Sequence, residues 1–105
     1  MEQILPVELA ELLKSENPPT VIDVREPDEY EICRIEGSIL IPLGEIGSRL
    51  DELDPEGDYV MQCHHGRRSQ MAGEVLLSNG FTRVRNLATG IDGWSMTVDA
   101  NVRRY

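Results

Sequence analysis

The hydrophobic residues of this chain follow two spacings, which predict strands and helices in alternation. Apolar runs rich in β-branched residues predict strands at residues 3–5, 20–24, 58–62 and 81–87. Apolar residues that recur every three or four positions predict helices at residues 7–14, 45–53 and 70–77. This alternation indicates an α/β fold in which a mostly parallel central sheet carries helices on both faces.

The last part of the chain allows more detailed expectations. The final predicted helix should start at Ser69 and end at Asn79, where Gly80 follows as a C-terminal cap. Its buried face should consist of Met71, Val75 and Leu76. The strand at 81–87 should be the more exposed one of the sheet. The polar tail, residues 95–105, should pack loosely across the surface or serve as a docking end.

Length and charge limit the classes of function. The chain has 105 residues, 40% of them hydrophobic, which suits one domain spanning residues 1–105. Its formal net charge of -9 argues against nucleic-acid partners and against adhesion to an anionic membrane. Acidic residues crowd positions 26–36 and 45–58, which are expected to be solvated faces. A locally positive site is expected from Arg67, Arg68, Arg83 and Arg85.

The sequence also suggests a compartment. It does not begin with a charged segment followed by an apolar one, and no apolar run approaches the length of a membrane span. We therefore expect a cytoplasmic location. Cys33 and Cys63 should both be free thiols there, because a reducing compartment disfavours disulfides. Cys33 is expected to be structural.

The candidate chemistry lies in the turn between the strand at 58–62 and the helix at 70–77. The first amides of a helix lack intrahelical partners and carry partial positive charge, so they attract an anion. Gly66 permits an unusual backbone angle there. Cys63 is the one group in the turn that can become a nucleophilic anion, and its thiol should ionise more readily than that of a free cysteine. The turn reads Cys63-His64-His65-Gly66-Arg67-Arg68-Ser69.

This turn resembles the C-x-x-G-x-R-[ST] active-site loop of rhodanese (thiosulfate sulfurtransferase) domains. The matching residues are Cys63, Gly66, Arg68 and Ser69. The resemblance implies the three-layer, rhodanese-like form of the α/β fold. It also implies that Cys63 accepts a sulfane sulfur and carries it as a persulfide. The implied substrate-binding residues are His64, His65, Gly66, Arg67, Arg68 and Ser69.

A second stretch resembles the D-V-R-x-x-x-E-[YF] segment of the same family. It consists of Asp23-Val24-Arg25 with Glu29 and Tyr30. Its charges suggest a buried or half-buried ion pair that fixes the loop beside the active site. A general-acid role for Asp23 is the alternative, because a carboxylate at the end of a strand can reach the catalytic face.

Two more stretches match the family with departures. Residues 35–43 resemble G-H-I-x-G-A-x-x-I-P, except that Cys33 and Arg34 stand where Gly and His are usual. Residues 89–94 resemble G-G-I-x-x-W, with Thr89 in place of the first glycine. Trp94 is expected to anchor the core below the site.

The resemblance implies a two-step sulfur transfer. The Cys63 thiolate attacks the outer sulfur of thiosulfate or another small-molecule persulfide donor, and the bound sulfur then passes to cyanide, a thiol or a protein acceptor. No metal or organic cofactor is expected, because loop amides, the helix dipole and the arginines hold the anions. His64 and His65 could steer anions or shuttle protons, or could be plain surface residues.

Three alternatives remain open at this point. A cysteine-based phosphatase or arsenate reductase would use a similar loop, but those enzymes carry five residues between Cys and Arg, whereas Cys63 and Arg68 enclose four. A non-catalytic sulfur-relay or sensing module would keep the fold without turnover. A zinc site is disfavoured because adjacent histidines lack the usual ligand spacing; its ligands would be Cys33, Cys63, His64 and His65.

Overall fold

The computed structural model describes residues 1–105 and contains one sheet of five strands in the order β1-β5-β4-β2-β3. All neighbouring strands are parallel. The strands are β1 (Glu2–Ile4), β2 (Thr20–Asp23), β3 (Ile39–Leu40), β4 (Asp58–Gln62) and β5 (Arg83–Leu87). The α/β fold with a parallel central sheet is therefore confirmed.

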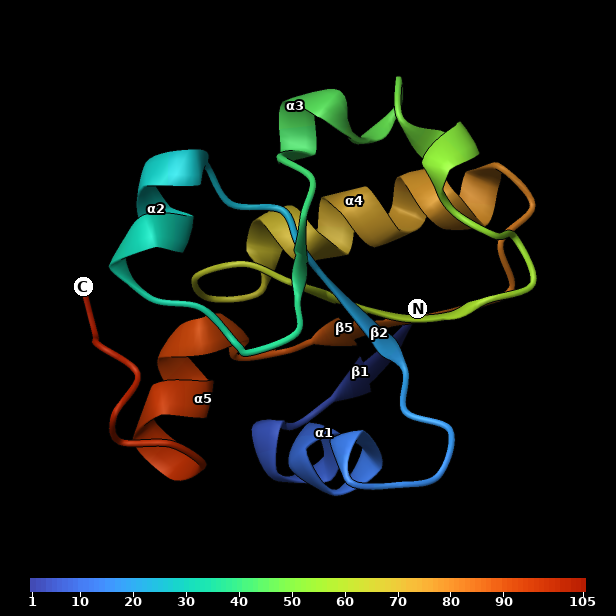
Figure 1. Ribbon diagram of the computed structural model, residues 1–105. Coiled ribbons are helices and arrows are strands. Elements are labelled where there is room, and N and C mark those ends of the chain that lie inside the picture. Colours follow the sequence, from blue (N-terminus) through green and yellow to red (C-terminus); the bar gives the residue numbers. More distant parts are fainter.

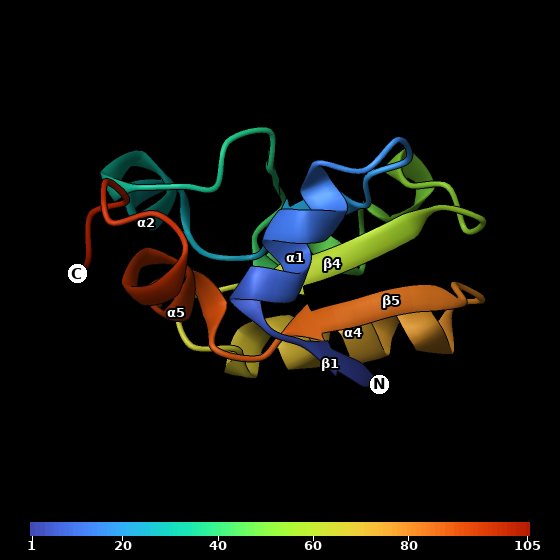
Figure 2. The same ribbon diagram turned by 90° about the horizontal axis from the view of Figure 1, so that it is seen from below.

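Helices cover both faces of this sheet. Figure 1 shows α1 and α5 together on one face and α3 and α4 on the other, and Figure 2 shows α1 and α5 in front of the sheet with α4 behind it. The helices are α1 (Pro6–Leu13), α2 (Pro27–Ile32), α3 (Leu43–Ile46), α4 (Arg67–Ser78) and α5 (Gly90–Thr97), with a 3-10 turn at Leu50–Glu52. None of the helices combines the length and the apolar character that crossing a bilayer requires.

The strands divide the hydrophobic core into two layers because successive side chains point to opposite faces. In the middle strand β4, Met61 packs into the layer beneath α3 and α4, and Val60 packs into the layer beneath α1 and α5. Trp94 of α5 is 7% exposed and belongs to the second layer, which confirms its predicted role as a core anchor. Burial of each such side chain stabilises the fold by about 1.5–3 kcal/mol.

The predicted helix at 45–53 is wrong in its extent. The structure has α3, which ends at Ile46, and then the separate 3-10 turn. Gly47 follows α3 directly, and glycine lowers helix propensity by about 1 kcal/mol. The Ser48 hydroxyl also donates a hydrogen bond back to the Glu45 carbonyl, which favours a local turn.

The start and the buried face of α4 also differ from the prediction. The helix begins at Arg67, with Gly66 as its N-cap, so Ser69 lies inside the first turn. Met71 is 51% exposed. The buried positions follow helical spacing but include small and polar residues that a hydrophobic pattern overlooks; they are Ser69, Ala72, Gly73 and Leu76.

Strand β5 is not the more exposed strand that its sequence suggested. It lies between β1 and β4, and β1 shields its outer edge. Val84 and Leu87 are buried in the two core layers, and Asn86 is buried as well. The prediction failed because β1 reaches β5 from the far end of the chain, which no local pattern records.

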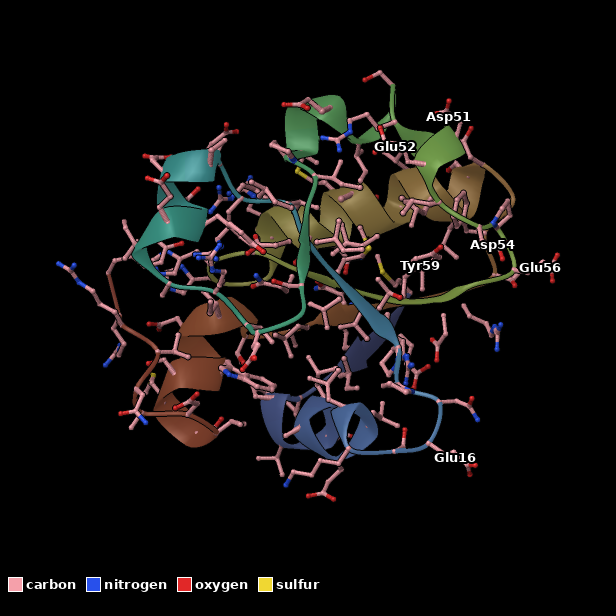
Figure 3. All side chains as sticks on the ribbon, viewed as in Figure 1. Glu16, Asp51, Glu52, Asp54, Glu56 and Tyr59 are labelled. Atoms are coloured by element: carbon pink, nitrogen blue, oxygen red, sulfur yellow. The ribbon has the colours of Figure 1, made fainter.

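Acidic side chains gather where the strands begin, as Figure 3 shows for Glu16, Asp51, Glu52, Asp54 and Glu56. Tyr59 fixes the loop at this end of the sheet, because its hydroxyl accepts a hydrogen bond from the Asp54 amide and donates one to the Asp54 carbonyl.

Two of the four arginines that were expected at the candidate site lie at this end of the sheet instead. Arg85 pairs with Asp58 at 2.8 Å, and Arg83 donates a hydrogen bond to the Glu56 carbonyl.

Candidate active site

Cys63 lies at the end of β4, the middle strand, where the carboxyl ends of the parallel strands meet. Its side chain is 1% exposed. The first amides of α5 hold the loop in place, because Ile91 N–H donates to the Cys63 carbonyl at 2.8 Å and Asp92 N–H donates to the His64 carbonyl at 3.1 Å. The carbonyls of Cys63 and His64 therefore face α5. The backbone amides later in the loop can then face the Cys63 sulfur.

Two backbone amides point at the Cys63 sulfur. Gly66 N–H lies 3.1 Å from Sγ and Ser69 N–H lies 3.4 Å from it. The loop can turn this tightly because Gly66 has φ +107, and a Cβ at this position would strike the Ala88 carbonyl. The predicted special backbone angle at Gly66 is therefore confirmed. Convergent amides of this kind stabilise a negative charge.

A buried polar network lies behind the cysteine. The Ser69 hydroxyl is 3.3 Å from Cys63 Sγ and donates to Asn86 Oδ1 at 2.5 Å. The Asn86 amide group donates to the Gly66 carbonyl at 3.0 Å. Asn86 thus ties two parts of the loop to β5, and sequence reasoning missed it because a single polar residue in a strand carries no distinguishing pattern.

Arg68 is paired with a carboxylate. Its guanidinium forms two parallel hydrogen bonds with Glu29 of α2, at 2.7 and 2.9 Å. The hydrogen bonds from Arg68 hold the pKa of Glu29 at about 2, well below its ordinary value. Arg67 is exposed and points its charge to solvent. The two arginines therefore lie in different electrostatic surroundings, although they are adjacent in sequence.

The predicted ion pair in the second stretch is confirmed. Asp23 and Arg25 are fully buried and lie 2.6 Å apart at their closest atoms. Burial opposes the charge on Arg25, but hydrogen bonds with Asp23 and Tyr105 keep its pKa above the ordinary value. Both oxygens of Asp23 accept hydrogen bonds from Arg25, which favours the structural role of Asp23 over the general-acid alternative.

Tyr105 corrects the expectation of a loosely packed tail. Its hydroxyl donates to Glu29 at 2.8 Å and accepts from Arg25 at 2.9 Å. Its ring stacks on His64, with centroids 4.0 Å apart and ring planes 7° apart. Burial raises the pKa of Tyr105 to about 12. The tail is thereby tied to the rim of the cysteine loop.

The two histidines differ in their surroundings. His64 is half-buried between Tyr105 and His65, and its Nε2 has no hydrogen-bond partner. Burial, followed by the neighbouring His65, lowers the pKa of His64. His65 is exposed, with Nε2 lying 3.7 Å from Asp92.

These histidines and Asp92 form the one group of three close candidate metal ligands. The two histidine rings are stacked on each other, with their planes 26° apart. Asp92 is also engaged by Arg104 at 3.0 Å. Neither cysteine belongs to the group, so the zinc set with Cys33 and Cys63 is not assembled. Both cysteines are free thiols, as expected.

Comparisons with known proteins identify the family and several relatives of this chain. Residues 5–97 match the family described as "Rhodanese-like domain". The putative sulfur carrier protein YrkF of Bacillus subtilis is 41% identical over 75 residues, covering 71% of this chain and 40% of YrkF, so the chain spans less than half of that protein. Thiosulfate sulfurtransferase GlpE of Pseudomonas fluorescens is 33% identical over 96 residues, covering 91% of this chain and 87% of GlpE. The crystal structure of a rhodanese-related protein from Thermoplasma volcanium matches with a TM-score of 0.85 and 33% identity, covering 93% of this chain and 94% of that one.

Proposed function

The chain belongs to the rhodanese-like domain family, and from this premise we propose that it transfers a sulfane sulfur through a persulfide on Cys63. The observation that carries the proposal is the position of Gly66 and Ser69 N–H at 3.1 and 3.4 Å from Cys63 Sγ. An amide cradle around a cysteine sulfur stabilises the thiolate that attacks and the anionic sulfur that is then carried.

In the first half-reaction, the Cys63 thiolate attacks the outer sulfur of thiosulfate or of another persulfide donor. A bond forms between Sγ and that sulfur, and the bond to the leaving group breaks, so that sulfite or a thiol departs with the electron pair. The cradle residues proposed to hold the anions are His64 to Ser69. Arg67 offers an unpaired positive charge at the entrance, whereas Arg68 offers one that it shares with Glu29.

In the second half-reaction, a nucleophile takes the terminal sulfur and Cys63 leaves as the thiolate. Cyanide, a small thiol or a protein thiol can be this nucleophile. Among the relatives, GlpE is named as a thiosulfate sulfurtransferase and YrkF as a putative sulfur carrier protein. His64 is suited to remain neutral beside the incoming nucleophile, because burial lowers its pKa.

The proposed reaction needs no metal or organic cofactor. Free thiols at Cys33 and Cys63 further suit a reducing compartment such as the cytoplasm.

The geometry favours this reaction over phosphoryl transfer. Only four residues separate Cys63 from Arg68, and the guanidinium is already occupied by Glu29. A phosphatase needs a wider loop and a free bidentate arginine for the tetrahedral group. One bound sulfur needs less space than a phosphoryl group, so the short loop suits it.

The decisive experiment isolates the intermediate. The protein is incubated with thiosulfate in the absence of an acceptor and examined by intact and peptide mass spectrometry. We expect one added sulfur atom on the peptide that contains Cys63, and its release by cyanide or a reducing thiol. The Cys33→Ser variant should gain the sulfur and the Cys63→Ser variant should not. Absence of the added sulfur, together with turnover of a phosphate ester, would assign the loop to the phosphatase class.

A further inference from the structure

Three buried side chains form a line of polar contacts that starts at the reactive sulfur. Cys63 directly follows β4, Ser69 lies in the first turn of α4, and Asn86 lies in β5, with exposures of 1%, 0% and 3%. The Ser69 Oγ stands between Cys63 Sγ at 3.3 Å and Asn86 Oδ1 at 2.5 Å. Because all three side chains are buried, water cannot replace a hydrogen-bond partner that one of them loses.

The directions of these hydrogen bonds follow from the chemistry of the atoms. The Gly66 carbonyl can only accept, so the group of Asn86 that faces it at 3.0 Å must be the NH2. The same NH2 donates its second hydrogen to Gln3 Oε1 at 2.9 Å. Asn86 therefore presents its oxygen to Ser69, and the Ser69 hydroxyl must donate to that oxygen. This leaves a lone pair of Ser69 Oγ facing the sulfur, where it can accept a hydrogen bond from the Cys63 thiol.

The contact with the Ser69 hydroxyl therefore fits the thiol and opposes the thiolate, whereas the backbone amides of Gly66 and Ser69 favour the thiolate. Once the thiol proton has left to solvent, the negative sulfur faces the lone pair of Ser69. The hydroxyl can turn and donate to the sulfur, but Asn86 Oδ1 then remains buried without a donor, which is unfavourable. We propose that Asn86 is a positioning residue that restrains ionisation of Cys63 by holding the hydroxyl of Ser69.

The restraint has a consequence for sulfur loading, which rests on the proposed function. When the Cys63 thiolate attacks thiosulfate, a bond forms between Sγ and the outer sulfur, the original S–S bond breaks, and sulfite leaves with the electron pair. Sγ becomes neutral and the negative charge moves to the terminal sulfur. Ser69 can then keep its bond to Asn86 without facing a charged Sγ. The network thus disfavours the free thiolate relative to the loaded state and strengthens the drive to accept sulfur.

The test measures ionisation directly and does not depend on sulfur transfer. The full chain with Cys33→Ser, in which Cys63 is the one thiol, is titrated by the ultraviolet absorbance of the thiolate against a blank that also carries Cys63→Ser. Asn86→Ala should lower the pH midpoint of thiolate formation by about one unit, because the competing acceptor is gone. In a Ser69→Ala background the same substitution should leave the midpoint unchanged. Gln3→Ala, which removes only the outer partner of Asn86, should also leave it unchanged.

Three outcomes would overturn the proposal: no fall in the midpoint with Asn86→Ala, an equal fall in the Ser69→Ala background, or an equal fall with Gln3→Ala. If Asn86→Ala does not fold, the Asn86 side-chain carbonyl carbon is followed by NMR in the protein that retains Asn86. Its resonance should shift with the same midpoint as the Cys63 thiolate, and this shift should vanish with Ser69→Ala. The proposal is also rejected if the resonance does not shift when the Cys63 thiolate forms, or if it still shifts in the Ser69→Ala variant. Because no sulfur donor is present, failure of the sulfurtransferase proposal would leave these results interpretable.

Discussion

The ring of Tyr105 lies parallel to the ring of His64, with the centroids 4.0 Å apart. The Tyr105 hydroxyl reaches past this stack to Glu29 and Arg25. One tail residue therefore contacts the cysteine loop, α2 and the buried ion pair of Asp23 and Arg25. This relationship predicts that the tail supports the stability of the loop.

Removal of the Tyr105 hydroxyl should destabilise the protein measurably. Tyr105→Phe keeps the stacked ring but deprives Glu29 and Arg25 of a partner, which should lower the free energy of unfolding by about 1 kcal/mol. Tyr105→Ala should lower it by about 2 kcal/mol, because the stacking is lost as well. Urea unfolding measures both changes, with the exposed Arg103→Ala as the matched control. A loss in the control as large as in Tyr105→Ala would show that the tail acts through charge and not through Tyr105.

Arg68 and Glu29 should have opposite effects on the use of thiosulfate. Arg68→Ala removes a charged donor near the loop and should raise the KM for thiosulfate by about tenfold. Glu29→Gln keeps Arg68 but releases its charge from the pair, so the KM should fall. Steady-state kinetics with cyanide as the acceptor measures both, and Arg83→Ala, which lies at the opposite end of the sheet, serves as the control. If Glu29→Gln raises the KM as Arg68→Ala does, the pair acts as a structural clamp and not as a source of positive charge.

The pairing of Glu29 also predicts how stability depends on pH. Hydrogen bonds from Arg68 lower the pKa of Glu29 from 4.5 to about 2 in the folded protein. A lowered folded-state pKa stabilises the fold above the unfolded value, and this stabilisation is lost as the pH falls from 4.5 toward about 2. Glu29→Gln should therefore show a shallower loss of unfolding free energy across this window than the parent protein. Equal slopes in urea unfolding at several pH values would mean that Glu29 is unpaired in solution.

Gly66 and Gly37 provide a matched pair of substitutions. Both have positive φ, but a Cβ at Gly66 would strike the Ala88 carbonyl, whereas a Cβ at Gly37 would meet nothing within 4 Å. Gly37→Ala should therefore cost only the backbone strain, about 1–2 kcal/mol. Gly66→Ala should cost more and should also displace its amide from the sulfur. Thermal unfolding with persulfide mass analysis measures both effects; similar losses for the two variants would contradict the crowding at Gly66.

Local sequence signals predicted the parts of the site that are continuous along the chain. The apolar run before Cys63, the glycine three residues later and the helical pattern at 70–77 together predicted a strand, a turn and helix amides that point back at the loop. The charges of the segment that starts at Asp23 suggested a buried or half-buried ion pair, and the structure shows it between Asp23 and Arg25. In these cases the physical cause lies within a few residues.

The contacts that the sequence did not reveal connect distant residues. Glu29 and Arg68 are 39 positions apart, and Tyr105 and Glu29 are 76 apart. Asn86 was indistinguishable from any polar residue of a half-exposed strand until β1 was seen to cover that edge. Such partners depend on the strand order, which hydrophobic spacing does not determine.

The pairing of β1 with β5 affects how the site is assembled during synthesis. β1 contributes Glu2 and Gln3, and its only neighbour in the sheet is β5, which begins at Arg83. A growing chain must therefore keep its first strand without a sheet partner until the last strand has been made. Because β5 also supplies Asn86, a ribosome-bound fragment that stops before this strand cannot hold Ser69 in its native orientation. We expect the cysteine loop to form its native hydrogen bonds only after β5 has been made, so a fragment that stops before β5 would lack the contact between Ser69 and Asn86.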